Sequence, residues 1–497
     1  MTRLYRRHRN HATPWLHIRI APETLGDRAG TAALHGFADV PIIPAMLHTP
    51  PPFRLALALG LGLATPVFAA DAPEAQLSAI AEAVDPQALH ATIEKLVGFG
   101  TRHTLSDTVS ETRGIGAARR WTKARFGAIS RECGGCLEIV TPSQMVTGKR
   151  VPASTEVMDV VAIQRGTGDP ARVVAITGHI DSRVTDVMDA SHDAPGANDD
   201  ASGVAAVLES ARILSKRRFA ATIVYGVLSG EEQGLYGGKV LADYAKEKGW
   251  KVEADLNNDI VGNSHGQDGV NDNGVVRVFS EGTKALETPE QAAKRRYNGG
   301  EVDSPSRNLA RFVAGLAERT LVNFRVNMVY RTDRYGRGGD QVEFLEHGFP
   351  ALRFTEPHED YRREHQDLRT EQGVPYGDTI DRVDFDYLAQ VTRLNAITLA
   401  ALANAPAPVQ GVAISGAVTT DTVLNWTPQP GVASYRVWWR DTTAPQWQHS
   451  RTYAAGVDPG HAVLKNVDLD DFFFGVSAIS ADGWESPVSF PGDAGSF

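Results

Sequence analysis

The stretch RVVAITGHIDS, residues 172–182, decides the fold. Its first half is a continuous apolar run, which is typical of a strand buried on both faces of a sheet. Its second half consists of small and polar residues, and it begins where the strand is expected to end, at His179. Two later runs repeat this arrangement: TIVYGVLSGEE (222–232) ends in two glutamates, and VEADLNNDI (252–260) ends next to Asp259. Polar groups therefore follow three buried strands.

Strand and helix patterns alternate along residues 70–405. Apolar runs predict strands at 157–164, 172–177, 222–228, 252–260, 275–279 and 351–355. Helix-period segments predict helices at 204–214, 240–248, 309–317 and 385–403. This alternation is typical of an α/β fold, a three-layer sandwich around a mostly parallel sheet. Ligand sites in such folds lie at the carboxyl ends of strands, so we expect the polar groups to converge there.

Five side chains of metal-binding types recur in order along this region: His179, Asp199, Glu232, Asp259 and His365. Zinc in a hydrolytic site takes nitrogen and oxygen ligands and keeps one position for water. Two zinc ions close together need a bridging carboxylate, because the two cations otherwise repel strongly. Asp199, in the glycine-bounded loop PGANDDASG (195–203), is the natural bridge. We therefore expect two Zn²⁺ per monomer, one held also by His179 and Asp259, the other by Glu232 and His365.

Two further carboxylates are expected to act beside the metals. Asp181 follows His179 by two residues, where it can accept the other ring N–H of that ligand and fix its orientation. Glu231 precedes Glu232 in SGEEQGLYGG (229–238), and a turn there lets Glu231 face the attacking water as general base. Two Zn²⁺ against three carboxylates and one hydroxide sum to zero charge, which a buried site tolerates.

Each of these features has an ordinary explanation when taken alone. A His-x-Asp pair often arises by chance, and a Glu-Glu pair usually lies on a solvated face. An Asp-Asp pair before a helix is usually a cap, a role that Asp200 or Ser202 can take. The joint order of the motifs, each at a strand end or a helix start, favours the metal site. His358 shares an acidic loop with His365 and is the alternative for the last ligand, for which we prefer His365.

The motifs of residues 151–403 resemble the bacterial di-zinc aminopeptidase family, whose relatives include glutamate carboxypeptidase and glutaminyl cyclase. The matching segments are GHIDS (178–182), PGANDDASG (195–203), EEQGLYGG (231–238) and EHQDLR (364–369). The resemblance implies that Asp199 rather than Asp200 bridges the metals, that a cis peptide follows Asp199, and that Glu231 is the base.

The same resemblance implies a zinc-dependent exopeptidase that hydrolyses N-terminal residues from peptides through a metal-bridged water. The alternatives are a carboxypeptidase or glutaminyl cyclase of the same fold, and a non-catalytic surface-binding protein. In family terms Asp340 lies near the site, and Tyr335 is a candidate donor to the developing oxyanion. Arg331, Arg334 and Arg337 cluster beside them. These three arginines are expected either to be exposed to solvent or to contact a substrate carboxylate.

The N-terminal region reads as an export signal. Arg54 precedes the apolar run LALALGLGLA (55–64), and a small-residue pattern follows it, with cleavage expected after Ala69. The apolar run has about ten residues, whereas a bilayer span takes roughly 20, so we expect no transmembrane anchor. Residues 46–69 are thus the predicted signal peptide, Met46 is the candidate start, and residues 1–45 are a misassigned or additional extension. We therefore expect a secreted or periplasmic protein.

The two cysteines, Cys133 and Cys136, lie in CGGC, and in an oxidising compartment they are expected to close a small structural loop. A helical pattern precedes CGGC and a strand-like run follows it, which is the reverse of the order typical of a redox motif. The formal net charge is −10, and no sustained basic stripe occurs, so nucleic acid is an unlikely class of partner.

Residues 407–497 differ in pattern from the rest of the chain. Short alternating runs at 422–426, 434–440, 461–467, 472–479 and 487–490 predict strands separated by turns. The size of this segment and its YRVWW strand (435–439) resemble a fibronectin type III β-sandwich. Trp439 and Trp447 suit either core packing or contact with a surface or polysaccharide. The chain is thus expected to contain a peptidase domain at 70–405 and a second, all-β domain.

Overall fold

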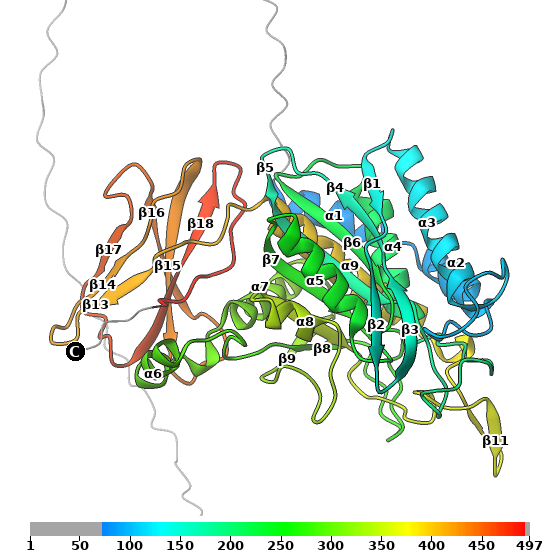
Figure 1. Ribbon diagram of the computed structural model, residues 1–497. Coiled ribbons are helices and arrows are strands. Elements are labelled where there is room, and N and C mark those ends of the chain that lie inside the picture. Colours follow the sequence, from blue (N-terminus) through cyan, green and yellow to red (C-terminus); the bar gives the residue numbers. More distant parts are fainter. Residues whose placement is uncertain (1–71, 493–497) are drawn as a thin grey trace, which may run out of the picture. The chain divides into compact units, whose positions relative to one another are not determined.

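The computed structural model describes residues 72–492 (Figure 1). The predicted extension (1–45) and signal peptide (46–69) lie outside these residues. Among the described helices, none combines the length and the apolar character that crossing a bilayer requires.

An eight-stranded mixed sheet forms the centre of the larger region, in the order β1-β4-β6-β5-β7-β10-β8-β9. The neighbours β6, β5, β7 and β10 run parallel, whereas β1, β4 and β8 join the sheet in antiparallel pairs. The strands are β1 (Leu137–Val140), β4 (Val160–Gln164), β5 (Asp169–His179), β6 (Ala221–Leu228), β7 (Lys251–Asn258), β8 (Val275–Phe279), β9 (Arg325–Val329) and β10 (Ala351–Thr355). The predicted α/β fold is confirmed, with the parallel strands at its centre.

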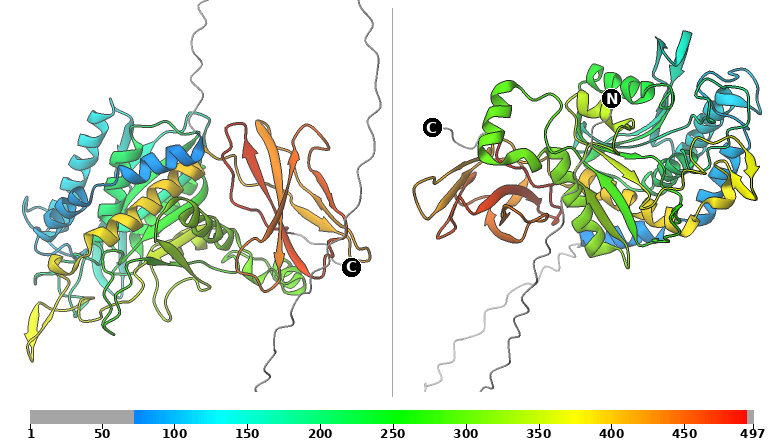
Figure 2. Two further views of the ribbon diagram at one scale, coloured as in Figure 1. Left: turned by 180° about the vertical axis from the view of Figure 1, so that it is seen from behind. Right: turned by 90° about the horizontal axis from the view of Figure 1, so that it is seen from below.

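Helices cover both faces of this sheet and complete the three layers (Figure 2). One face packs on α1 (Pro73–Glu82), α2 (Pro86–Val97), α3 (Gly114–Glu132), α4 (Ala201–Leu214), α7 (Pro305–Thr320) and α9 (Phe385–Asn404). The other packs on α5 (Tyr236–Glu247) and α8 (Gln341–Glu346). Along β5, Val174 and Ile176 face the first core, while Val173 and Ala175 face the second. Burial on both faces explains why β5 reads as a continuous apolar run.

The strand predicted at 157–164 is two strands. Asp159 separates β3 (Val151–Met158) from β4, and its buried carboxylate accepts the N–H of Ser229 at 3.0 Å. β3 pairs with β2 (Ser143–Gly148) in a separate hairpin. A second small hairpin joins β11 (Arg369–Glu371) to β12 (Val374–Tyr376).

The C-terminal segment forms two three-stranded sheets, β13-β14-β17 and β16-β15-β18. Their strands are β13 (Ala413–Ser415), β14 (Thr422–Asn425), β15 (Val432–Asp441), β16 (His449–Ala454), β17 (His461–Leu464) and β18 (Phe472–Ser480). Trp426, Tyr435 and Phe474 contribute to the core of this sandwich. The predicted strand at 487–490 is wrong, because Ser489 forms an isolated bridge with Val476.

A buried ion cluster joins this sandwich to the α/β region. The carboxylate of Asp303, which lies after α6 (Pro289–Asn298), contacts Arg311 of α7 and Arg440 of β15 at 2.6 Å each. The three side chains are at most 1% exposed. Trp447 lies against both guanidinium groups, which are 5.9 and 5.3 Å from its ring centre. Packing is therefore the observed use of Trp447.

Cys133 and Cys136 form a disulfide. The bond closes the turn that follows α3, where Gly134 and Gly135 both have positive φ angles. The predicted structural loop is confirmed.

Candidate metal centre

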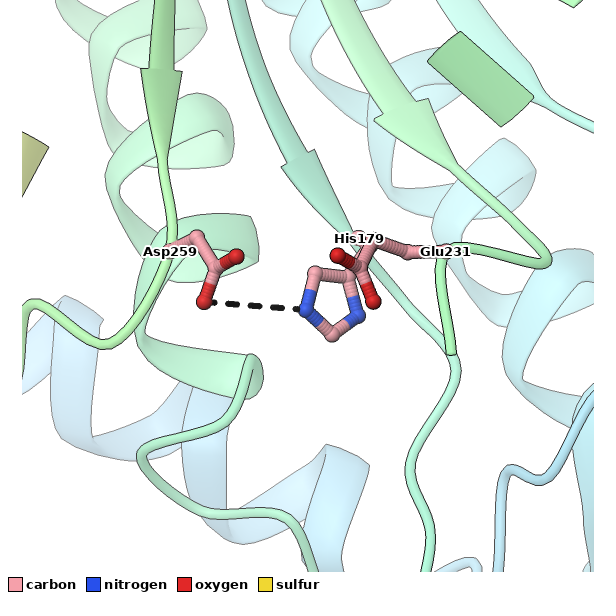
Figure 3. Close-up of side chains that lie close together, drawn as sticks. All are labelled: His179, Glu231 and Asp259. Carbon is pink, nitrogen blue, oxygen red and sulfur yellow. Dashed lines mark ion pairs between the residues drawn. The ribbon is translucent and has the colours of Figure 1, made fainter. Parts of the chain in front are cut away.

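The polar residues that follow the parallel strands meet at one edge of the sheet. His179 is the last residue of β5, Asp259 directly follows β7, and Glu231 and Glu232 lie just beyond β6. Asp199 stands before α4, and His365 comes from the loop that follows β10. Figure 3 shows His179 with the carboxylates of Glu231 and Asp259 beside it.

These side chains form two groups of three. His179, Glu231 and Asp259 each place one ligand atom within 4.8 Å of the others. Asp199, Glu232 and His365 do the same. All five predicted ligands therefore fall in the two groups, and Glu231, the predicted base, completes the first.

Asp199 connects the two groups. Its Oδ1 lies 3.1 Å from His179 Nε2, and its Oδ2 lies 2.9 Å from His365 Nε2. One carboxylate oxygen thus faces each group, which is the arrangement that a bridging ligand requires. The peptide bond Asp199–Asp200 is cis, as expected. The carboxylate of Asp378 accepts the N–H groups of Asn198 and Asp199 at 2.8 and 2.7 Å, which fixes the loop.

Asp200 has a structural role that separates it from its neighbour. It is the N-cap residue of α4, and its carboxylate accepts the N–H of Gly203 at 2.9 Å. The same carboxylate accepts the N–H of His179 at 2.9 Å. Of the two adjacent aspartates, Asp199 faces the ligand groups while Asp200 anchors the backbone on both sides.

Asp181 acts through different atoms from those expected. Its backbone carbonyl lies 3.1 Å from His179 Nδ1, whereas its carboxylate Oδ1 is 3.7 Å away. The carboxylate instead accepts the N–H groups of Gly230, Glu231 and Glu232 at 2.9, 3.3 and 3.1 Å. Asp181 therefore holds the turn that carries the two glutamates. Sequence spacing gave no sign of this contact, because the turn lies about fifty residues further along the chain.

Charge is concentrated in a buried space. Burial raises the pKa of Glu231 well above its usual value, and the Asp259 and Glu232 carboxylates raise it further, although His179 acts in the opposite direction. Burial lowers the pKa of His179, but the nearby carboxylates of Asp181, Asp199 and Asp259 raise it well above the ordinary value. Carboxylates this close together and this buried are stabilised as anions by a cation among them.

His365 and His358 are clearly distinguished. His365 Nε2 lies 2.9 Å from Asp199 Oδ2 and 2.9 Å from Glu232 Oε1. His358 Nδ1 lies 3.2 Å from Asp268, an exposed residue outside both ligand groups. The geometry thus favours His365 as the last ligand.

Arg353, which sequence analysis missed, contacts a predicted ligand. Its Nη1 lies 2.7 Å from Asp259 Oδ2 and 3.3 Å from Asp333 Oδ2, and its side chain is fully buried in β10. An arginine inside the apolar run ALRFT (351–355) was the available signal, because a buried cation needs a carboxylate partner.

The arginines before α8 are partly accounted for by neighbouring acids. Arg334 and Arg337 contact Glu359 at 3.3 and 2.8 Å, and Arg337 also contacts Glu364 at 2.9 Å. Tyr335 is 90% exposed and lies 5.5 Å from the guanidinium group of Arg331. Asp340 accepts the N–H of Gly238 at 2.9 Å and is buried, so it packs α5 against α8.

The donor set fits zinc. The candidate ligand atoms are imidazole nitrogens and carboxylate oxygens, which zinc prefers in proteins. Asp199, Glu232 and Asp259 are at most 5% exposed. Glu232 Oε1 is buried without hydrogen-bond geometry to any donor, and the nitrogen that contacts it, His365 Nε2 at 2.9 Å, is itself a candidate ligand atom.

Comparisons with known proteins identify a family of peptidases. The model of peptidase family M28 matches residues 159–394. A probable zinc metalloprotease of Leptosphaeria maculans is 44% identical over 437 residues, which cover 87% of this chain and 99% of that protein. One of Pyricularia oryzae is 43% identical over 435 residues, covering 86% of each chain. Both relatives are fungal, whereas the motif resemblance was to a bacterial family.

Solved structures give a more distant likeness. LapB from Legionella pneumophila is 20% identical, with a TM-score of 0.48 over 66% of this chain and 74% of that one. The Porphyromonas gingivalis glutaminyl cyclase is 15% identical, with a TM-score of 0.44 over 64% of this chain and 98% of that one.

Proposed function

The chain belongs to peptidase family M28, and on that premise we propose that it is a two-zinc aminopeptidase that removes residues from the amino terminus of peptides. The observation that carries the proposal is the position of Asp199, whose two oxygens face separate ligand groups at 3.1 and 2.9 Å. A site for a single ion does not need such a residue.

The two ligand groups support one division of the residues. In this proposal His179 and Asp259 would hold one zinc ion, Glu232 and His365 would hold the other, and Asp199 would be shared. Bound zinc supplies Lewis acidity, which activates water and polarises a carbonyl group. Asp181 keeps the Glu231–Glu232 turn in place through its three backbone hydrogen bonds.

Glu231 is the proton carrier in this proposal. It lies in the turn directly before Glu232, and its carboxylate is grouped with His179 and Asp259, within reach of a water at the metal centre. The attacking water transfers a proton to Glu231 as its oxygen bonds to the peptide carbonyl carbon. The C–N bond then breaks, and Glu231 passes the proton to the leaving amine nitrogen.

Zinc content and substrate choice together test the proposal. We expect two zinc ions per monomer, hydrolysis of aminoacyl p-nitroanilides, and loss of this activity with a chelator. N-acetylated analogues should resist cleavage, because an aminopeptidase requires a free amino group. One zinc ion with cyclisation of N-terminal glutamine would instead indicate a glutaminyl cyclase. Release of C-terminal residues from N-acetylated peptides would indicate a carboxypeptidase, and no turnover with intact ligands would favour a binding protein.

The remaining features of the proposal concern location and the second domain. We propose that residues 70–405 form the peptidase domain and that residues 407–497 form a fibronectin type III-like domain able to contact a surface or polysaccharide. Export through a signal peptide at 46–69 is consistent with the disulfide, which forms in oxidising compartments. Mass spectrometry of the mature N-terminus tests the expected cleavage after Ala69.

A further inference from the structure

Arg102 is a fully buried arginine that lies in the connection between α2 and α3. Its guanidinium group donates hydrogen bonds to four backbone carbonyl groups. Nε donates to Ile180 at 2.7 Å, Nη2 donates to Gly196 at 2.9 Å, and Nη1 donates to Pro195 and, at 3.2 Å, to Leu96. A buried charge is costly unless hydrogen bonds compensate it, so these four bonds keep the group in place.

The carbonyl acceptors belong mainly to the two segments that carry His179 and Asp199. Ile180 directly follows His179 at the end of β5, and residues 195–196 begin the loop that carries Asp199. A guanidinium group is planar, and its N–H groups point in fixed directions. Arg102 therefore holds the end of β5 and this loop at a set distance from each other.

The backbone around Arg102 joins the same two segments. Its N–H donates to Ser182 Oγ at 3.1 Å, and Ser182 Oγ donates to the carbonyl of Ala194 at 2.7 Å. The N–H of Ala194 in turn donates to the carbonyl of Gly100 at 2.9 Å. The chain at residues 100–102 thus lies between the strand end and the loop, in hydrogen-bond contact with both.

Gly196 shows how closely the loop approaches Arg102. A Cβ atom at this glycine would lie 2.9 Å from Arg102 Nη2 and 2.6 Å from Ser182 Cβ, so a larger residue would displace its neighbours. The carbonyl of Gly196 also accepts the N–H of Ala201, the first residue of α4, at 3.1 Å. Asp199 lies between these two residues in the sequence. A shift of the guanidinium group would therefore be transmitted to Asp199 from both sides.

The charge of Arg102 and its hydrogen bonds would act on zinc in opposite directions. Burial lowers the pKa of the guanidinium group to about 10, and four carboxylates oppose this change, those of Asp378, Asp181, Asp200 and Asp199. The group therefore remains protonated at neutral pH. A cation near the ligand groups repels zinc and weakens its binding, whereas hydrogen bonds that fix the ligand segments strengthen it. A substitution that keeps the charge separates the two effects.

We propose that Arg102 is a positioning residue of the metal centre, which fixes His179 relative to Asp199 and thereby increases the affinity for zinc. The inference rests on the proposed function, because it takes these two residues as zinc ligands. Arg102 acts through the backbone, since its hydrogen bonds end on carbonyl groups of residues near the ligands. Zinc affinity is therefore the property that this arginine should control.

Arg102→Lys tests the inference, because it keeps the positive charge and loses the planar arrangement of donors. An ammonium group offers three N–H bonds from a single atom, so it cannot reach all four carbonyl groups. We expect zinc affinity, measured by competition with a chelator, to fall about 10–100-fold. The visible absorption of the cobalt(II)-substituted protein, which reports ligand geometry, should also change.

Arg307→Lys is the matched control. Arg307 is 1% exposed, and its Nε and Nη2 donate to the hydroxyl and carbonyl groups of Ser280 at 2.7 Å each. Ser280 follows β8, which runs antiparallel to β10 and therefore ends toward the sheet edge opposite the metal centre. Both substitutions should lower the melting temperature, but Arg307→Lys should leave zinc affinity and the cobalt(II) absorption unchanged.

Ser182→Ala provides a milder variant if Arg102→Lys does not fold. It removes the hydroxyl group that links Arg102 to Ala194, and it should weaken zinc binding to a smaller extent. Wild-type zinc affinity and cobalt(II) absorption in folded Arg102→Lys, or failing that in Ser182→Ala, would overturn the inference. An equal loss of zinc affinity in Arg102→Lys and Arg307→Lys would overturn it as well, because it would show a general loosening of the fold.

Zinc binding and turnover together distinguish this inference from the proposed function. Weaker zinc binding by Arg102→Lys in a protein without aminopeptidase activity would support the inference and refute the proposed function. Two zinc ions and aminopeptidase activity in the wild type, with normal zinc affinity in Arg102→Lys, would refute the inference alone.

Discussion

Replacing Arg353 with methionine should increase the affinity for zinc and lower the stability of the metal-free protein. Arg353 Nη1 lies 2.7 Å from Asp259 Oδ2, so in the proposed site this carboxylate would be shared between a guanidinium group and a zinc ion. Removing one partner of a buried ion pair costs about 3–5 kcal/mol when nothing replaces it. In the loaded protein, zinc on Asp259 replaces much of the lost positive charge.

Two effects on zinc affinity oppose each other. Arg353 repels a cation held by the same carboxylate, and two unit charges 4 Å apart interact by about 4 kcal/mol at an effective dielectric constant of 20. Arg353 also holds Asp259 in position. Without Arg353, zinc binding must immobilise the Asp259 side chain, which costs roughly 1 kcal/mol of conformational entropy. Repulsion is the larger effect, so we expect Arg353→Met to bind zinc at least about tenfold more tightly, which corresponds to about 1.4 kcal/mol.

Competition with a zinc chelator measures this affinity directly. Arg353→Lys is the matched control, because it keeps the positive charge while changing the hydrogen-bond geometry. We expect its zinc affinity to remain near that of the wild type. Unchanged or weaker zinc binding in Arg353→Met would refute the electrostatic reasoning and show that positioning of Asp259 dominates.

Three further predictions follow from particular contacts. Glu231→Gln should retain both zinc ions and lose about 10²–10⁴-fold in kcat, since a positioned base contributes that much. Zinc analysis and steady-state kinetics measure these two quantities. Full activity in the variant would show that Glu231 is not the base. Burial raises the pKa of Glu281 to about 7, so ionising this carboxyl destabilises the fold as pH rises above its unfolded value of about 4.5. Glu281→Gln should therefore raise the melting temperature more at pH 8 than at pH 4.5, and equal shifts would contradict the pKa. Asp303→Asn should destabilise the fold by about 3–5 kcal/mol in urea, because it leaves the buried Arg311 and Arg440 without their carboxylate. Glu485→Gln, whose pair with Arg436 is partly exposed, should change stability by less than about 1 kcal/mol.

The fold could be predicted from the sequence where strands are buried on both faces. β8 and β10 have the bounds that the apolar runs predicted, and the helix predicted at 385–403 is α9 with one further residue. β9 was missed because it lies at the sheet edge and its residues are exposed or only partly buried. A strand of that kind has no continuous apolar run. Asp159, which interrupts the strand predicted at 157–164, is a single polar residue whose buried contact is visible only in three dimensions.

The site could be predicted to a similar extent, and for a similar reason. Strand ends carry His179, Glu232 and Asp259, and topology alone places the ends of parallel strands together. The partners of Asp181 and Arg353 could not be predicted, because each contact joins segments that are distant in sequence. Spacing along the chain indicates what lies at one strand end, but it does not indicate which backbone atoms lie opposite a side chain.

Buried acids that are not ligands position much of the metal centre. Asp200 anchors the start of α4 to the end of β5, Asp378 fixes the loop that carries Asp199, and Asp181 fixes the turn after β6. Each of these carboxylates accepts backbone N–H groups, so it constrains a ligand without competing for metal. Removing any one of them should disturb the relative positions of ligands whose own side chains are intact. The presence of all five candidate ligands is therefore insufficient for a two-metal site, because the site also depends on the acids that hold the ligand backbones in place.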